Sequence, residues 1–115
     1  MGGSLILYST DLMLLSSASH AARQSGLDFH SVTSIEAAGP HLQNPETLFC
    51  LDLSMLGADP QSIAALAAPA VLSRAIAFGP HVHTARLDAA RAAGFGEVLT
   101  RGQFFSRIQS GRLLE

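Results

Sequence analysis

Residues 47–59, TLFCLDLSMLGAD, place a run of apolar residues directly before one carboxylate, Asp52. Turn-forming residues flank the stretch, Asn44-Pro45 before it and Gly57 to Pro60 at its end. A continuous apolar run between turn signals is typical of a strand buried on both faces, as in parallel sheets. Asp52 is then expected at the carboxyl end of that strand, where open α/β sheets place ligands and chemistry. The alternative is an aspartate that only caps a turn or a helix.

Strands and helices alternate on both sides of this stretch. The patterns predict strands at residues 4–8, 27–32, 47–52, 74–78 and 97–100. They predict helices at residues 11–25, 61–68, 83–93 and 103–109, with Pro69 ending the helix after Asp59-Pro60. A further short helix opens at Ser34, and Gly39-Pro40 is expected to weaken or shift it. This β-α order with short connections predicts a parallel sheet covered by helices on both faces.

Length and composition predict one domain spanning residues 1–115. The chain has 115 residues with 48% hydrophobic content, enough for a single core. The formal net charge is -2, and the seven basic residues are arginines scattered along the chain, so nucleic-acid binding is disfavoured. Leu114-Glu115 has the form of a vector-derived end.

The expected location is cytoplasmic. Cys50 is the single cysteine, lies within the predicted buried strand and has no disulfide partner in the chain, which fits a reducing compartment. No apolar run approaches the length of a membrane span, and residues 1–4 lack the positive start of a signal peptide. We therefore expect no membrane association, and Cys50 is expected to be an inert core residue.

The chain resembles the receiver domain of two-component response regulators over essentially its whole length. Residues 51–57, LDLSMLG, are similar to the family stretch LDLxMPGxDG, in which the aspartate accepts a phosphoryl group. Residues 74–79, RAIAFG, resemble its fourth strand, and residues 90–101 resemble its AxxAGAxxYLTKP segment. The resemblance implies an α/β flavodoxin-like fold with a doubly wound, five-stranded parallel sheet of order 2-1-3-4-5.

The sequence departs from the family at the positions that carry its chemistry. Receivers hold magnesium with two acidic residues after the first strand, but those positions are Ser9 and Thr10 here, and only Asp11 beyond them is acidic. The family's hydroxyl residue after the fourth strand is Gly79, and its lysine after the fifth is Arg101. The aromatic residue that reports phosphorylation corresponds to Val98. The altered site thus consists of Ser9, Thr10, Asp11, Asp52, Gly79 and Arg101.

These departures suggest a degenerate receiver, or pseudo-receiver, that acts in signal transduction through protein-protein interaction. It would not be an enzyme and would need no cofactor. Asp52 would be structural and pair with Arg101. The alternative is an active phosphorelay receiver that a histidine kinase phosphorylates on Asp52 with magnesium. An unrelated enzyme on the same fold is disfavoured, because neither a nucleophile with its base nor a phosphate-binding glycine loop is visible.

Further residues are candidates for binding. His81 and His83, with Asp52, could ligate a transition metal, although His83 could instead cap the next helix; Asp11 is a weaker metal candidate. Residues 83–93, 97–100 and 103–109 correspond to the common dimer surface of receivers. A protein partner or a second copy would therefore contact Leu87, Val98 and Phe105. The altered crevice itself is an alternative site for a ligand or partner.

Overall fold

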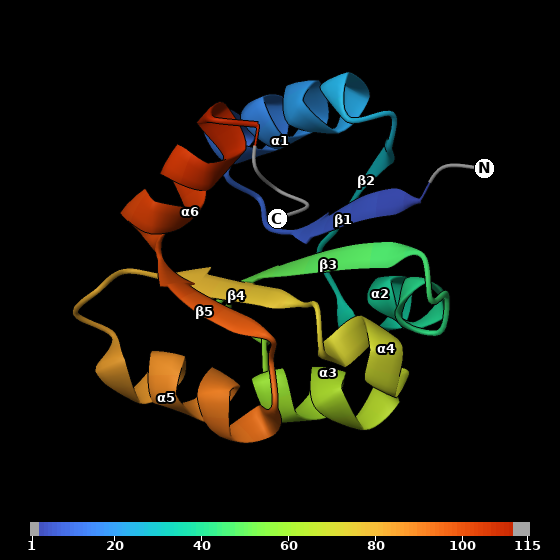
Figure 1. Ribbon diagram of the computed structural model, residues 1–115. Helices are drawn as coiled ribbons and strands as arrows, with labels where there is room; N and C mark the ends of the chain where they lie inside the picture. Colours follow the sequence, from blue (N-terminus) through green and yellow to red (C-terminus); the bar gives the residue numbers. More distant parts are fainter. Residues whose placement is uncertain (1–2, 112–115) are drawn as a thin grey trace.

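The computed structural model describes residues 3–111 as a five-stranded parallel sheet between helical layers (Figure 1). Leu114-Glu115 lies outside the described residues. The strands run in the order β2-β1-β3-β4-β5, and neighbouring strands are parallel throughout. Their bounds are β1 Ser4–Tyr8, β2 Asp28–Val32, β3 Thr47–Asp52, β4 Ile76–Gly79 and β5 Glu97–Thr100. The expected strand order and flavodoxin-like architecture are confirmed.

Two helical layers cover the sheet, as Figure 1 shows. On one face lie α1 (Leu12–Gln24) and α6 (Arg101–Gln109). On the other lie α2 (Ile35–Leu42), α3 (Pro60–Leu66), α4 (Pro69–Leu72) and α5 (Thr84–Ala93). Every residue of β3 is buried, because successive side chains of this central strand point into one layer and then the other. The apolar run that precedes Asp52 therefore builds both halves of the core.

Stacked aromatic rings help to fix α6 against the sheet. Phe78 of β4 and Phe104 of α6 have ring centroids 3.9 Å apart and planes inclined by 4°. Both side chains are buried among residues of β1, β3 and α1. This packing holds the first turn of α6, which carries Arg101, beside the carboxyl edge of the sheet.

The helices differ from the sequence prediction in the second and third connections. Helix α2 continues through Gly39 and Pro40 to Leu42, because Ser34 caps its start and Ala38 and Leu42 are fully buried. The predicted end of the preceding helix at Pro69 is wrong: α3 ends at Leu66, and Pro69 occupies the first position of α4, which was not predicted. Proline suits that position because the first N–H of a helix has no intrahelical partner.

Helix α6 begins two residues earlier than the predicted Gln103. Thr100 and Gln103 form a capping box, in which the Thr100 hydroxyl accepts from the Gln103 N–H and the Gln103 side chain accepts from the Thr100 N–H. The Thr-x-x-Gln spacing is a recognisable signal for such a start. The earlier start places Arg101 in the first turn of α6.

Candidate functional site

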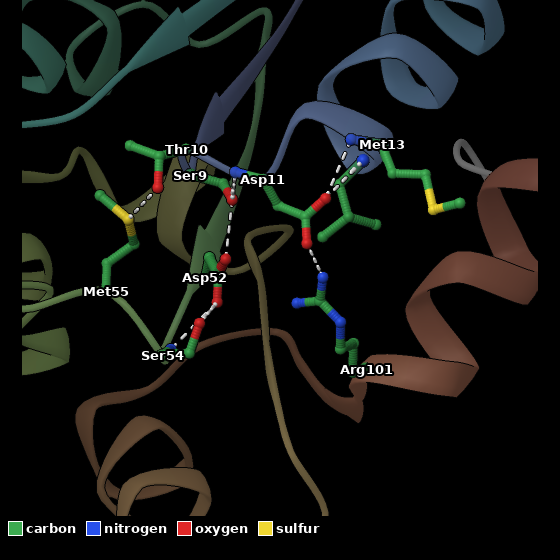
Figure 2. A network of polar contacts seen from close by, with 9 residues as sticks. Ser9, Thr10, Asp11, Met13, Asp52, Ser54, Met55 and Arg101 are labelled. Atoms are coloured by element: carbon green, nitrogen blue, oxygen red, sulfur yellow. Dashed lines mark hydrogen bonds and ion pairs between the residues drawn. The ribbon is translucent and has the colours of Figure 1, made fainter.

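The residues of the altered receiver-like site meet at the carboxyl edge of the sheet. Ser9 follows β1, Asp52 ends β3, Gly79 ends β4, and Arg101 follows β5. Parallel strands bring these positions to one edge, as their registers show for Tyr8 beside Leu51 and for Asp52 beside Phe78. The expected gathering of Ser9, Asp11, Asp52 and Arg101 is visible in Figure 2.

Asp52 is almost completely buried and both of its carboxylate oxygens accept hydrogen bonds. The residue is 2% exposed. Its Oδ2 accepts from the Ser9 hydroxyl at 2.7 Å, and its Oδ1 accepts from Ser54 N at 3.0 Å and from the Ser54 hydroxyl at 2.6 Å. The bond from the N–H two residues on is the Asx-type turn that the alternative interpretation of Asp52 anticipated. Asp52 is thus bonded to its own turn and to the loop that follows β1.

Ser9 connects the Asp52 carboxylate to the backbone of Asp11. Its side chain is fully buried, donates to Asp52 and accepts from the Asp11 N–H at 3.1 Å. Beside it, the Thr10 hydroxyl contacts the Met55 sulfur at 3.4 Å, which joins the β1–α1 loop to the β3–α3 loop. The two hydroxyl residues therefore fasten loops to each other at the positions where receivers carry magnesium-binding carboxylates.

Asp11 caps α1 and forms an ion pair with Arg101. Its Oδ1 accepts from Met13 N at 3.0 Å and from Leu14 N at 3.1 Å, while Oδ2 bonds Arg101. The predicted Asp52–Arg101 pair is therefore wrong. Ser9 and Ser54 take the oxygens of Asp52, and the early start of α6 directs Arg101 to the N-terminus of α1.

Gly79 leaves the edge without a hydroxyl at the end of β4, and its neighbour fills part of the space. A Cβ atom added at Gly79 would lie 3.2 Å from the Leu53 Cβ. Leu53 is buried beside it, and its N–H donates to the Phe78 carbonyl at 2.8 Å. A side chain at position 79 would thus require Leu53 to yield slightly.

His81 and His83 do not form a metal site with Asp52. Both imidazoles are exposed in the β4–α5 connection. Within residues 3–111 no group of three or more histidine, cysteine, aspartate or glutamate residues is arranged to hold a metal ion. His83 does occupy the N-cap position of α5, but its side chain makes no capping hydrogen bond.

The expected interface residues differ in accessibility. Leu87 is 6% exposed and packs in the core beneath α5, so its predicted place on a docking surface is wrong. The helical stripe that includes Leu87 faces the sheet. Val98 and Phe105 are partly exposed and pack on opposite faces of the sheet, and their interface role stays a prediction.

Cys50 lies in the middle of β3 and is fully buried. Burial among apolar side chains raises the pKa of its thiol far above the ordinary value, because the thiolate would be desolvated. Arg107 opposes this rise and Glu97 adds to it. A thiol with so raised a pKa is a poor nucleophile.

Sequence reasoning missed Ser54, Met55 and Arg86 as parts of this region. Ser54 is the second hydroxyl partner of Asp52, and the Asp-x-Ser spacing is a usable signal for that turn. Met55 contacts Thr10. Arg86 of α5 donates to the Leu53 carbonyl. No local sequence pattern predicts this contact, because it joins segments that are distant in the chain.

Comparison with known proteins finds similarity of fold alone. No family model matches the sequence, and no curated protein sequence matches it. A putative response regulator from Chloroflexus aurantiacus superposes with a TM-score of 0.70 at 15% identity over 100% of both chains. A response regulator receiver domain from Rhodospirillum rubrum gives a TM-score of 0.68 at 16% identity, covering 95% of this chain and 91% of that one.

The receiver domain of a sensor histidine kinase from Pseudomonas aeruginosa also gives a TM-score of 0.68, at 13% identity over 97% of this chain and 98% of that one. That structure has a magnesium ion coordinated in its active site cleft. The protein therefore has the fold of response regulator receiver domains. In the described part of the chain, none of the helices combines the length and apolarity needed to cross a bilayer.

Proposed function

We propose that this protein is a degenerate receiver domain that transmits signals by binding another protein, without magnesium-dependent phosphorylation of Asp52. The receiver fold and the sequence likeness around Asp52 support a place in two-component signalling. The observation that carries the proposal is the internal bonding of Asp52. Both of its oxygens accept from serine side chains, and the residue is 2% exposed.

The donor set at the edge does not fit magnesium. Magnesium prefers octahedral oxygen coordination by carboxylates, water and phosphate oxygens. Asp11 is the other carboxylate here, and its oxygens already serve the N-terminus of α1 and Arg101. Ser9 and Thr10 offer only neutral hydroxyls in place of the two carboxylates. A cation would have to displace Arg101 and break the cap before it gained these ligands.

Arg101 could supply positive charge near Asp52, but it is already paired. Its side chain is 39% exposed, and its guanidinium neutralises Asp11. The ion pair in this position neutralises the charge of the carboxylate without a metal ion. Because the pair links α1 to α6, it also favours one fixed arrangement of the two helices. Constant geometry suits a protein that binds its partner constitutively.

Phosphorylation chemistry gives the direct test. The purified chain is incubated with magnesium and either acetyl phosphate or beryllofluoride, and the products are read by intact mass and by NMR shifts near Asp52. We expect no adduct and no shift at magnesium concentrations that saturate an ordinary receiver domain, which serves as the positive control. An adduct that disappears in Asp52→Asn would support the alternative function, an active receiver that takes a phosphoryl group from a histidine kinase.

A partner or a second copy would bind through the face formed by α5, β5 and α6. Val98 and Phe105 are its partly exposed apolar residues. Sedimentation velocity over a range of concentrations tests the homodimer. Self-association that Val98→Ser weakens, while Leu66→Ser at a 43% exposed position of α3 does not, would identify this face. A monomer at all concentrations would leave the proposed partner as a different protein.

A further inference from the structure

The imidazole rings of His30 and His41 lie against each other at the β2 edge of the sheet. His30 is the middle residue of β2, and His41 belongs to the last turn of α2. Their ring centroids are 5.3 Å apart, and their planes are inclined by 26°. Because β2 and β5 are the two opposite edge strands of the sheet, the pair is remote from the α5-β5-α6 face.

The packing of β2 and α2 brings the two histidines together. Side chains two residues apart on a strand share a face, so His30 points to the same side of the sheet as Val32. Val32 is buried in the core layer that also contains Ala38 and Leu42 of α2. Both of these helix residues are fully buried, which fixes the rotation of α2 that places His41 beside the strand.

Ordered main chain holds both positions. His30 is aligned with Ile6 of β1 in the parallel ladder. The His41 carbonyl accepts from Asn44 N at 3.2 Å, in the turn that follows α2. A ligand of the two side chains would therefore not have to order the backbone that carries them.

The ring nitrogens of the pair are available as ligands. Among residues 3–111, neither imidazole forms a hydrogen bond or an ion pair with another protein group. His30 is exposed and His41 is half-buried, so the pair is open to an ion from solution. A neutral imidazole is the commonest protein ligand of metal ions.

The spacing of the rings fits two ligands of one metal ion. An ion bound about 2.0–2.1 Å from an imidazole nitrogen lies about 3.2 Å from the ring centroid, so two ligands of a tetrahedral site have centroids about 5.2 Å apart. The centroids of His30 and His41 are 5.3 Å apart. Rotation about χ2, which is broad for histidine, is the adjustment that directs one nitrogen of each ring to the ion.

We propose that His30 and His41 bind one divalent transition-metal ion of the zinc, copper and nickel class, with water completing its coordination. Imidazole suits these ions, whereas magnesium and calcium prefer oxygen ligands. Asp28 shares the face of β2 with His30, but in the described part of the chain no three such residues are placed to hold a metal ion together. The ion thus joins the edge strand to α2 and keeps open positions. The proposal does not depend on whether Asp52 is phosphorylated.

Zinc titration of the ¹⁵N-labelled protein without a purification tag tests the site by NMR. We expect saturable shifts at His30, His41 and their neighbours in β2 and α2, and none with magnesium at the same concentration. His30→Gln and His41→Gln each remove one of the two protein ligands and should weaken zinc binding about tenfold or more. Zinc should raise the melting temperature of the parent but not of these variants, because it binds the folded pair. Parent affinity in either variant would overturn the proposal.

The chain contains a matched control in its second pair of neighbouring histidines. His81 and His83 are exposed and lie in one loop. The double variant His81→Gln/His83→Gln should keep the zinc affinity and the shifts in β2 and α2. If this variant loses zinc binding, the ion belongs to the loop and the proposal fails. A stoichiometry of one ion per two chains would place the ligands on two copies and would also overturn it.

Discussion

Asp11 and Asp52 are joined through Ser9, yet the two carboxylates are stabilised in opposite ways. Asp52 is 2% exposed and is bonded by neutral donors, the hydroxyls of Ser9 and Ser54 and one backbone N–H. The Asp11 side chain is 27% exposed and is bonded by a cation, Arg101, and by the positive N-terminus of α1. The charge of Asp52 is thus stabilised by neutral donors in a buried place, whereas the charge of Asp11 is stabilised by a cation in a partly exposed place at the same edge of the sheet.

The difference is the physical basis of our proposal that the edge does not bind magnesium. A shared cation site needs carboxylate oxygens that point to one common place and lack stronger internal partners. Here each carboxylate serves the element that carries it: Asp52 closes the turn after β3, and Asp11 starts α1. The hydroxyl of Ser9 donates to the Asp52 carboxylate and accepts from the Asp11 backbone N–H. The hydrogen bonds of this edge therefore connect its loops to one another.

Removing Asp52 should have the largest effect on stability. Asp52→Ala deprives the fully buried Ser9 hydroxyl of its acceptor, whereas the Ser54 hydroxyl is exposed and can turn to water. We expect the free energy of unfolding to fall by about 1–3 kcal/mol, the usual cost of a buried unsatisfied polar group. Urea denaturation measures the change. An Asp52→Ala protein as stable as the parent would break the contrast, because it would make Asp52 dispensable.

Ser9 gives the coupled test of the same contact. Ser9→Ala is expected to cost a similar amount, since Oδ2 of Asp52 then lacks its donor. The double variant should be destabilised by less than the sum of the two single changes, because it removes both ends of one bond. A double-mutant cycle from urea denaturation yields this coupling. Strict additivity would mean that the 2.7 Å contact contributes nothing specific.

Substitution of Asp11 should reduce stability by less, and the contributions of its helix cap and its ion pair can be measured separately. Asp11→Ala loses the cap of α1 and the Arg101 pair, with an expected loss of about 1–2 kcal/mol that comes mainly from the cap. Asp11→Asn keeps a capping oxygen and loses only the charge, so we expect a loss below about 1 kcal/mol that shrinks further in high salt. Thermal unfolding at low and high salt measures both. Equal losses in the two variants would show that the ion pair, not the cap, is the main contribution.

Local signals in the sequence predicted most of the fold. The run before Asp52 specified a buried central strand, and Gly94 and Asp59-Pro60 marked a helix end and a helix start that the structure contains. The order of strands in the sheet depends on long-range pairing, and it came from the family resemblance rather than from periodicity. The extra helix α4 was missed because Pro69 was interpreted as a helix end, whereas proline also suits the first position of a helix.

The site was predicted in its membership but not in its pairing. Ser9, Asp11, Asp52 and Arg101 meet as expected because parallel strands end at one edge. Which carboxylate Arg101 reaches depends on where α6 begins, and the capping box of Thr100 and Gln103 decides that start. The burial of Leu87 likewise depends on the rotation of α5 about its axis, which a weak alanine-rich stripe does not determine. Such contacts between distant segments lie beyond what local patterns specify.

The smallest expected effect on stability is that of Glu97. Like Asp11, it is a carboxylate paired with an arginine, but it lies away from the carboxyl edge of the sheet. Arg107 bonds both of its oxygens, and this hydrogen-bonded pairing holds the pKa of Glu97 below its ordinary value, against the opposing effect of partial burial.

The lowered pKa of Glu97 makes the stability depend on pH, because the unfolded chain binds more protons than the folded one. The pair's contribution to stability is therefore complete above the ordinary glutamate pKa of about 4.3 and is lost as pH falls through the lowered folded value. Because the side chain is 40% exposed, we expect Glu97→Gln to cost less than about 1 kcal/mol at pH 7 and almost nothing near pH 2. Urea denaturation across this range, with Asp88→Asn in the exposed Asp88–Arg91 pair as the control, measures the difference. A cost that does not change with pH would mean that Glu97 stabilises β5 and α6 through packing and not through its charge.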